Sequence, residues 1–134
     1  MDYSEALKYI QESGYKLTNK RKEMIRIFFN HDYIFSAKII FDFMKVHYPA
    51  ISIDTIYRNL NLFKQLSLIH HTEFQKQTYY YRNRMENSFY GHIICMKCRS
   101  IKSVVMNSSR TLVPYLCFSV SSYKFEIYGR CTKC

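Results

Sequence analysis

The 134 residues of this chain include 20 basic and 10 acidic side chains, a formal net charge of +10, and 48% of them are apolar. No apolar run approaches the roughly 18 residues of a membrane helix, and Asp2 and Glu5 interrupt the only N-terminal stretch that could resemble a signal peptide. We therefore predict a cytoplasmic protein with no membrane partner. The charge favours a polyanionic partner, nucleic acid above all, although solubility alone is an alternative explanation.

Four short helices are predicted in the first half, from apolar residues that recur at spacings of three and four. Their predicted N-caps are Ser4, Thr18, Ser36 and Ser52. Gly14 should end the first helix. The side chains expected to face inward are Leu7, Ile10, Ile25, Phe28, Phe29, Ile39, Ile40, Phe43, Met44, Ile53, Ile56, Leu60 and Phe63.

A β-hairpin should follow the helices, because residues 68–74 and 78–82 have strand composition on either side of the polar residues 75–77. Three helices, a fourth exposed helix and a hairpin describe a winged helix-turn-helix over residues 1–82.

The second half changes period. It is predicted to contain strands at residues 92–95, 100–105 and 122–129, with a short helix at residues 108–118. In the last strand Tyr123, Phe125 and Ile127 share one face. The predicted fold class is thus α+β: a winged helix-turn-helix, a hinge at residues 83–91, and a small α/β domain with a three-stranded sheet at residues 92–134.

Four of the five cysteines form two Cys-x-x-Cys pairs, 32 residues apart. Two such pairs suit tetrahedral Zn²⁺, and four thiolates leave no position for a catalytic water. We predict one structural zinc ion per chain, bound by Cys95, Cys98, Cys131 and Cys134, with the ion joining the two outer strands of the sheet. Loss of an ion that supplies about 10–16 kcal/mol should unfold the domain. Cys117, in an apolar stretch, is predicted to be a buried, inert thiol. A thioredoxin-like redox pair is the alternative.

The fourth predicted helix should point Tyr57, Arg58 and Asn61 outward. Arginine binds guanine through two hydrogen bonds in the major groove, and tyrosine can contact phosphate and thymine methyl groups. A second basic cluster, residues 16–22, opens the second helix, where cations and backbone amides would hold phosphates; Arg21 belongs to it. An ordinary solvated helix surface is the alternative interpretation.

Four stretches, GYKLTNKRKEM, ISIDTIYRNL, HIICMKC and KFEIYGRCTKC, follow one another in this order and spacing. Together they resemble the ferric uptake regulator (Fur) superfamily over nearly the whole chain. Within it, GYKLTNKR, DTIYRNL and KFEIYG look closest to the zinc uptake regulators of low-GC Gram-positive bacteria. The resemblance implies a homodimeric, metal-responsive repressor whose C-terminal domain dimerises and whose N-terminal domain binds a palindromic double-stranded DNA operator.

Residue by residue, the resemblance implies that Tyr57 and Arg58 are recognition-helix contacts and that Lys16 is a basic contact in the minor groove. It also implies that the four paired cysteines hold the structural zinc.

The family's sensory metal site is depleted in this sequence. Members of the family have a histidine-rich run before the first Cys-x-x-Cys, and the corresponding residues of this sequence are SFYGH. Of the ligands in that run only His92 is present, and Tyr90 occupies the position of a second ligand. The remaining family ligands fall near Ile34, His70, Arg84 and Tyr123. His70, His71 and His92 are the candidate sensory ligands, with Glu73 on the same predicted strand, and surface histidines are the alternative. We predict weakened or absent zinc control.

Two other functions compete with the repressor. One is a nucleic-acid-binding zinc protein without sequence specificity, which would use the basic second half and the stacking of Tyr79, Tyr80 and Tyr81 on bases. The other is a redox enzyme using the cysteine pairs.

Overall fold

The structure, a computed structural model, describes residues 1–84, 90–105 and 124–134, which form four helices and five strands. The chain divides into two units, residues 1–84 and residues 85–134. The predicted helix at residues 108–118, Cys117 and Tyr123 lie outside the described residues.

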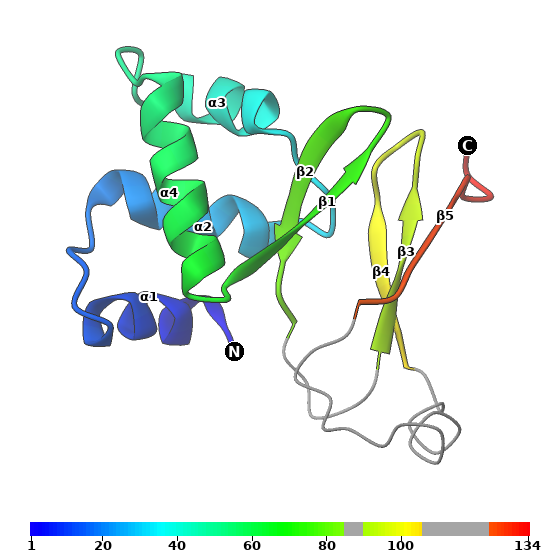
Figure 1. Ribbon diagram of the computed structural model, residues 1–134. Helices are drawn as coiled ribbons and strands as arrows, with labels where there is room; N and C mark the ends of the chain where they lie inside the picture. The colour runs from blue at the N-terminus through cyan, green and yellow to red at the C-terminus, as the bar shows by residue number, and fades with distance from the viewer. Residues whose placement is uncertain (85–89, 106–123) are drawn as a thin grey trace. The chain divides into compact units, whose positions relative to one another are not determined.

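The first unit is a winged helix-turn-helix (Figure 1). Its elements in chain order are α1 (Tyr3–Glu12), α2 (Asn19–Asn30), α3 (Ala37–Lys45), α4 (Ile53–Gln65), β1 (Ile69–Phe74) and β2 (Gln77–Arg82). Antiparallel β1 and β2 form the wing, and backbone hydrogen bonds of 2.8 Å in both directions between Phe35 and Tyr80 fasten it to the segment before α3.

Short polar side chains start the helices, because each accepts a hydrogen bond from an N–H of the first turn. Thr18, Ser36 and Ser52 cap α2, α3 and α4 as predicted. The predicted cap Ser4 is wrong: Asp2 caps α1, accepting from Glu5 N at 2.8 Å while the Glu5 carboxylate accepts from Asp2 N at 2.7 Å. These reciprocal bonds form a capping box and favour the earlier start. Gly14, at φ +86°, follows the end of α1 as predicted.

One apolar core joins the helices to the wing. Its fully buried members include Ile10, Met24, Ile25, Phe28, Ile40, Ile56, Leu60, Phe63 and Ile69. Two of the predicted inward residues are instead exposed, Phe43 by 47% and Ile53 by 44%. Phe43 lies at the rim, where its ring meets those of His31 and Phe35 at 6.2 and 6.4 Å.

The second unit contains a three-stranded sheet, as predicted, in the order β4 (Ile101–Val105), β3 (Tyr90–Cys95), β5 (Glu126–Gly129). Central β3 is antiparallel to β4 and parallel to β5. Tyr90 and Gly91, assigned to the hinge from sequence, are the first two residues of β3. Among the helices that the structure describes, none is both long enough and apolar enough to cross a membrane.

Candidate nucleic-acid interface and metal centre

Helix α4 presents a polar face opposite its buried face. The Ser52 hydroxyl accepts from Thr55 N at 3.2 Å and fixes the first turn, while Ile56, Leu60 and Phe63 are fully buried. On the other side Tyr57 is 47% exposed, the Arg58 side chain is 78% exposed, and Asn61 is exposed. The three residues predicted to contact DNA therefore share one accessible helix face.

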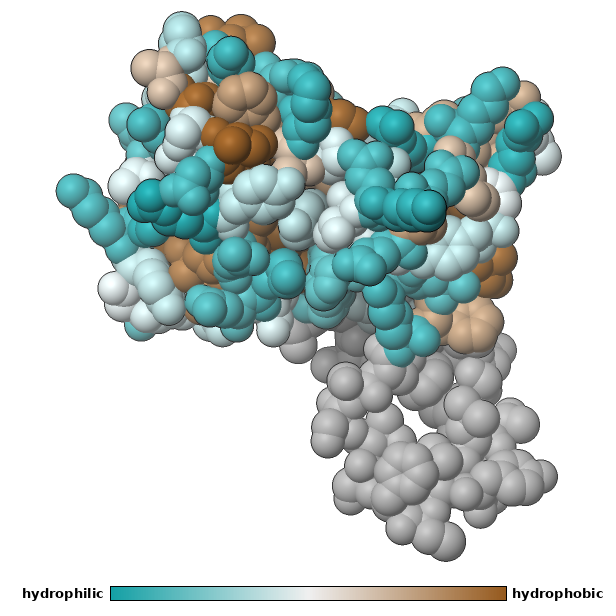
Figure 2. Space-filling view, turned by 45° about the horizontal axis from the view of Figure 1, so that its top comes forward, coloured by the Kyte–Doolittle hydropathy of each residue, from teal (hydrophilic) through white to brown (hydrophobic). Residues whose placement is uncertain are grey.

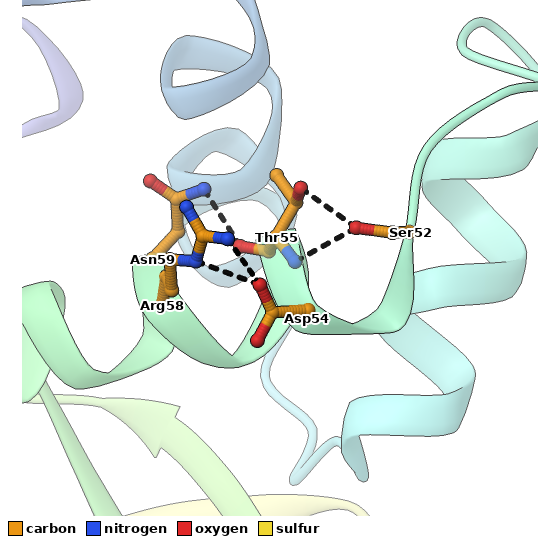
Figure 3. Close-up of polar contacts among 5 residues, drawn as sticks. All are labelled: Ser52, Asp54, Thr55, Arg58 and Asn59. Atoms are coloured by element: carbon orange, nitrogen blue, oxygen red, sulfur yellow. Dashed lines mark hydrogen bonds and ion pairs between the residues drawn. The ribbon is translucent and has the colours of Figure 1, made fainter.

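A fourth polar residue, Asp54, lies on this face one turn before Arg58. Arg58 Nε donates to Asp54 Oδ2 at 2.7 Å, and Arg58 Nη2 donates to the same oxygen (Figure 3). Asp54 was not among the residues predicted to lie in the site, although the four-residue spacing of an acid and a base on one helix was a usable signal.

Arg21 occupies a different environment from Arg58. Its Nε donates to Asn59 Oδ1 at 3.0 Å and its Nη1 donates to the backbone carbonyl of Lys16. Asn59, only 7% exposed, also donates from Nδ2 to the Thr55 carbonyl at 2.9 Å. Arg21 thus connects the start of α2 to α4, while the side chain of Lys16 lies in the exposed loop ahead of α2.

A pocket of about 460 Å³ lies where the start of α2 meets α4. Three cationic residues, Lys20, Arg21 and Arg58, line it together with Thr18, Asn19, Tyr48, Thr55 and Asn59. Lys20 Nζ stands 5.8 Å from the centre of the Tyr48 ring. The face shown in Figure 2 is mostly hydrophilic, with separate hydrophobic patches. A cationic pocket beside an exposed helix face suits the phosphates and base edges of a nucleic acid.

The three tyrosines proposed for base stacking are not available for it. Tyr79, Tyr80 and Tyr81 are 3%, 5% and 2% exposed, and burial raises the pKa of Tyr80. Tyr80 belongs to the apolar core of the first unit, and on the opposite face of the strand Tyr79 stacks on Phe74 with the two ring centres 4.4 Å apart.

The candidate sensory histidines are distributed over two strands. His70 and His71 are consecutive in β1 and exposed, so their side chains point to opposite faces of the wing; the His70 ring lies 5.9 Å from that of Tyr81. His92, 8% exposed, lies in β3 of the other unit with its ring 5.5 Å from that of Tyr90. Among the described residues, no group of three or more potential metal ligands contains any of these histidines.

Two further positions to which the resemblance assigns sensory ligands lie in the first unit. Ile34 is 1% exposed and belongs to the apolar interior. Arg84 donates from Nη2 to Asp32 Oδ1 and forms an ion pair there. Glu73, at 3.4 Å from Thr78 Oγ1, lies near the wing tip.

The four paired cysteines converge at one end of the second sheet. Their sulfurs all lie within 4.8 Å of one another, with Cys95 to Cys134 at 3.9 Å, Cys98 to Cys131 at 3.7 Å and Cys131 to Cys134 at 3.3 Å. Sulfurs at the corners of a tetrahedral zinc site are about 3.8 Å apart, from a Zn–S length of about 2.3 Å. Cys95 ends the central strand β3, so the prediction that the ion joins the two outer strands is wrong: it would join β3 to β5.

Backbone amides stabilise the thiolate form of Cys95, the most buried of the four cysteines. Cys131 N and Cys98 N donate to Cys95 Sγ at 3.3 and 3.4 Å, and these bonds, the one from Cys131 above all, lower the pKa of Cys95 to about 5. The Ser100 hydroxyl, 3.2 Å from Cys98 Sγ, lowers the pKa of Cys98. The neighbouring sulfurs, Cys131 first, raise the pKa of Cys134 to about 12.

This donor set fits a soft divalent cation. At neutral pH Cys95 is therefore a thiolate, and the hydrogen bond with Ser100 favours the thiolate of Cys98, whereas hydrogen bonding with Cys131 favours the protonated form of Cys134. Four sulfurs at tetrahedral spacing match Zn²⁺ and close its coordination sphere.

Comparison with known proteins gives matches over nearly the whole chain. The pattern of the Ferric uptake regulator family matches residues 12–128. The ferric uptake regulation protein of Staphylococcus aureus is 37% identical over 137 residues, an alignment that covers 100% of this chain and 98% of the relative.

Solved structures share the fold. The ferric uptake regulator of Helicobacter pylori superposes with a TM-score of 0.75 at 22% identity, covering 98% of this chain and 91% of the other. A zinc uptake regulator complexed with zinc and DNA gives 0.74 at 22% identity, with coverages of 98% and 91%. At this identity the likenesses establish the architecture alone.

Proposed function

This chain belongs to the ferric uptake regulator family, a family of transcription regulators and not of enzymes, and from this premise we propose that it is a dimeric, DNA-binding repressor. It acts in the cytoplasm, where its operators are. As a two-fold symmetric dimer it occupies a palindromic operator, with one α4 in the major groove of each half-site.

The exposed face of α4 carries this proposal. Tyr57, Arg58 and Asn61 lie together on the second helix of a helix-turn-helix, beside a pocket lined by cations. The recognition helix of such a motif contacts base edges while neighbouring groups hold the phosphates. Lys16 is the basic contact ahead of α2. Arg21 contributes to DNA binding mainly by positioning, because its guanidinium is already bound to Asn59 and Lys16.

In the second unit, Cys95, Cys98, Cys131 and Cys134 hold one Zn²⁺ per chain. The ion supplies a cross-link between the end of β3 and the segment after β5, and four sulfur ligands leave it no catalytic role. The unit that it stabilises is the dimerisation domain.

Regulation by a second metal ion is weak or lost. His70 and His71 point to opposite faces of the wing, Ile34 is buried, and the guanidinium of Arg84 carries positive charge where the family has a ligand. The motifs that resemble zinc uptake regulators make zinc the signal to test first. The curated relatives are named ferric uptake regulation proteins, so iron is tested beside it.

The DNA-binding proposal is tested by selecting sites from a randomised double-stranded DNA library with the full-length, zinc-loaded protein. We expect the wild type to select a palindromic site. In Arg58→Ala the free-energy preference for this site over other sequences should fall by about 1–3 kcal/mol, while the salt-dependent affinity for any DNA is retained. Equal weakening on every sequence would support a nucleic-acid-binding protein without specificity, a function already disfavoured by the burial of Tyr79, Tyr80 and Tyr81.

The regulatory proposal is tested by measuring operator affinity against free Zn²⁺ and Fe²⁺ after removal of loosely held metal only. We expect less than a tenfold change in affinity across the titration. A steep response at nanomolar or lower free metal would overturn the depleted-site proposal and leave the repressor proposal intact.

A further inference from the structure

We propose that Asp54 is a specificity-determining residue: the Asp54–Arg58 pair reads a guanine together with an adjacent base that carries an exocyclic amine in the major groove, cytosine or adenine. This inference rests on the proposed function of α4 and adds the class of base step that its DNA must contain.

The pair leaves the guanine-binding edge of Arg58 open. Asp54 Oδ2 accepts from both Nε and Nη2, which is the side edge of the guanidinium (Figure 3). A guanidinium has five N–H donors, so both hydrogens of Nη1 and one of Nη2 remain, and one hydrogen of each nitrogen points to the outer end. Those two nitrogens form the fork that binds O6 and N7 of guanine.

Asp54 also limits the orientations of that fork. A long arginine side chain loses considerable rotamer freedom when it binds, and a guanidinium already held by two hydrogen bonds to its own helix has lost part of it beforehand. Two interactions fix the helix turn that carries Asp54. The Ser52 hydroxyl accepts a hydrogen bond from Thr55 N in this turn, and Asn59, in the next turn, accepts one from Arg21 of α2.

The second carboxylate oxygen of Asp54, Oδ1, distinguishes between the possible bases at the position next to the guanine. Both contacts to Arg58 use Oδ2, and Oδ1 lies on a side chain that is 64% exposed on the same face as Tyr57 and Asn61. A carboxylate oxygen accepts from the N4 amine of cytosine or the N6 amine of adenine. The same oxygen is repelled by O4 of thymine and O6 of guanine, which acts as selection against the wrong base.

A simpler role for Asp54 makes a different prediction. An acidic residue in the first turn of a helix stabilises the helix dipole, and an exposed pair four residues apart adds a little more. In that role Asp54 affects stability only and leaves base preference unchanged.

The experiment is site selection from a randomised double-stranded DNA library with zinc-loaded, full-length wild type and three variants: Asp54→Asn, Glu12→Gln and Arg58→Ala. Glu12→Gln is the matched control, because Glu12 pairs with Lys8 at 3.6 Å, also four residues away on an exposed helix face, and its side chain is 62% exposed. Both isosteric changes remove one negative charge.

We expect wild type and Glu12→Gln to select guanine next to cytosine or adenine, with roughly fivefold or greater preference over thymine or guanine at the second position. Asp54→Asn should keep the guanine and lose that second preference to below about twofold, because an amide both donates and accepts. Arg58→Ala should lose the guanine. If Asp54→Asn selects the same sites as wild type, the inference is wrong while the repressor proposal stands. If wild type itself selects no sequence, both fail.

Discussion

Two arginines that were both predicted to contact DNA have different roles because their partners differ. Arg58 is held by an acid on its own helix and faces solvent, whereas Arg21 reaches Asn59, 38 residues later, and the carbonyl of Lys16. Arg58 was predicted as a DNA contact from its outward position on the fourth helix, and Arg21 from the basic cluster at residues 16–22. The distinction depends on which helix packs beside the arginine, and that information is not local.

Arg21→Ala should therefore destabilise the fold. It leaves the Oδ1 atom of Asn59, a residue 7% exposed, without its donor, and an unpaired buried polar group costs about 1–3 kcal/mol. Urea unfolding of the zinc-loaded protein, followed by far-ultraviolet circular dichroism, should show a lower midpoint with an unchanged slope. Lys20→Ala, which removes an exposed neighbouring cation, should change the unfolding free energy by less than about 0.5 kcal/mol. An unchanged midpoint for Arg21→Ala would show that the bond to Asn59 contributes no stability.

At the scale of single elements, local sequence predicted most boundaries. Thr18, Ser36 and Ser52 cap the helices that their positions indicated, because a cap satisfies N–H groups only three residues away. The turn of the wing differs from its prediction. Phe74 pairs with Gln77, so the loop contains two residues, Gln75 and Lys76, at φ 51° and 60°.

The double substitution Gln75→Asn with Lys76→Gly should stabilise the wing. A two-residue hairpin loop with two positive φ angles is the turn that Asn-Gly favours, and a side chain held in the left-handed region costs about 1 kcal/mol or more. We expect the free energy of unfolding to rise by about 1 kcal/mol. Lys76→Ala removes the same charge without relieving the backbone, and its thermal midpoint should not rise. A fall in stability for the double variant would contradict the turn geometry.

The two units are stabilised by different means. The first has a continuous apolar core, whereas in the described part of the second only Ile94, Cys95, Gly91 and His92 are buried. Val105, Phe125 and Ile127 are 70%, 42% and 45% exposed. Among the described residues of this unit, the four-sulfur cluster is suited to stabilise the sheet, because a bound structural metal ion contributes directly to folding.

Removing the metal should unfold the second unit and spare the first. Strong chelation of the full-length protein should raise amide deuterium uptake in residues 90–105 and 124–134, while the helices of residues 1–84 remain protected, because a structural zinc ion supplies about 10–16 kcal/mol. Cys95→Ser should reproduce the effect, and Cys117→Ser, which changes the one cysteine outside the two Cys-x-x-Cys motifs, should retain one zinc ion per chain. Continued protection of β3 and β5 without metal would show that the unit folds independently of it.

Features that depend on near neighbours along the chain could be predicted from the sequence: three of the four helix caps, the hairpin, the outward position of Tyr57, Arg58 and Asn61, and the two Cys-x-x-Cys pairs. Features that join distant segments became known only from the fold. It buried Tyr79, Tyr80 and Tyr81, left Phe43 and Ile53 exposed, and placed Cys95 on the central strand. It also directed Arg21 to Asn59 and left Arg58 to face solvent with Asp54. Burial and partner choice depend on how whole elements pack, and a local pattern of residues does not specify that packing.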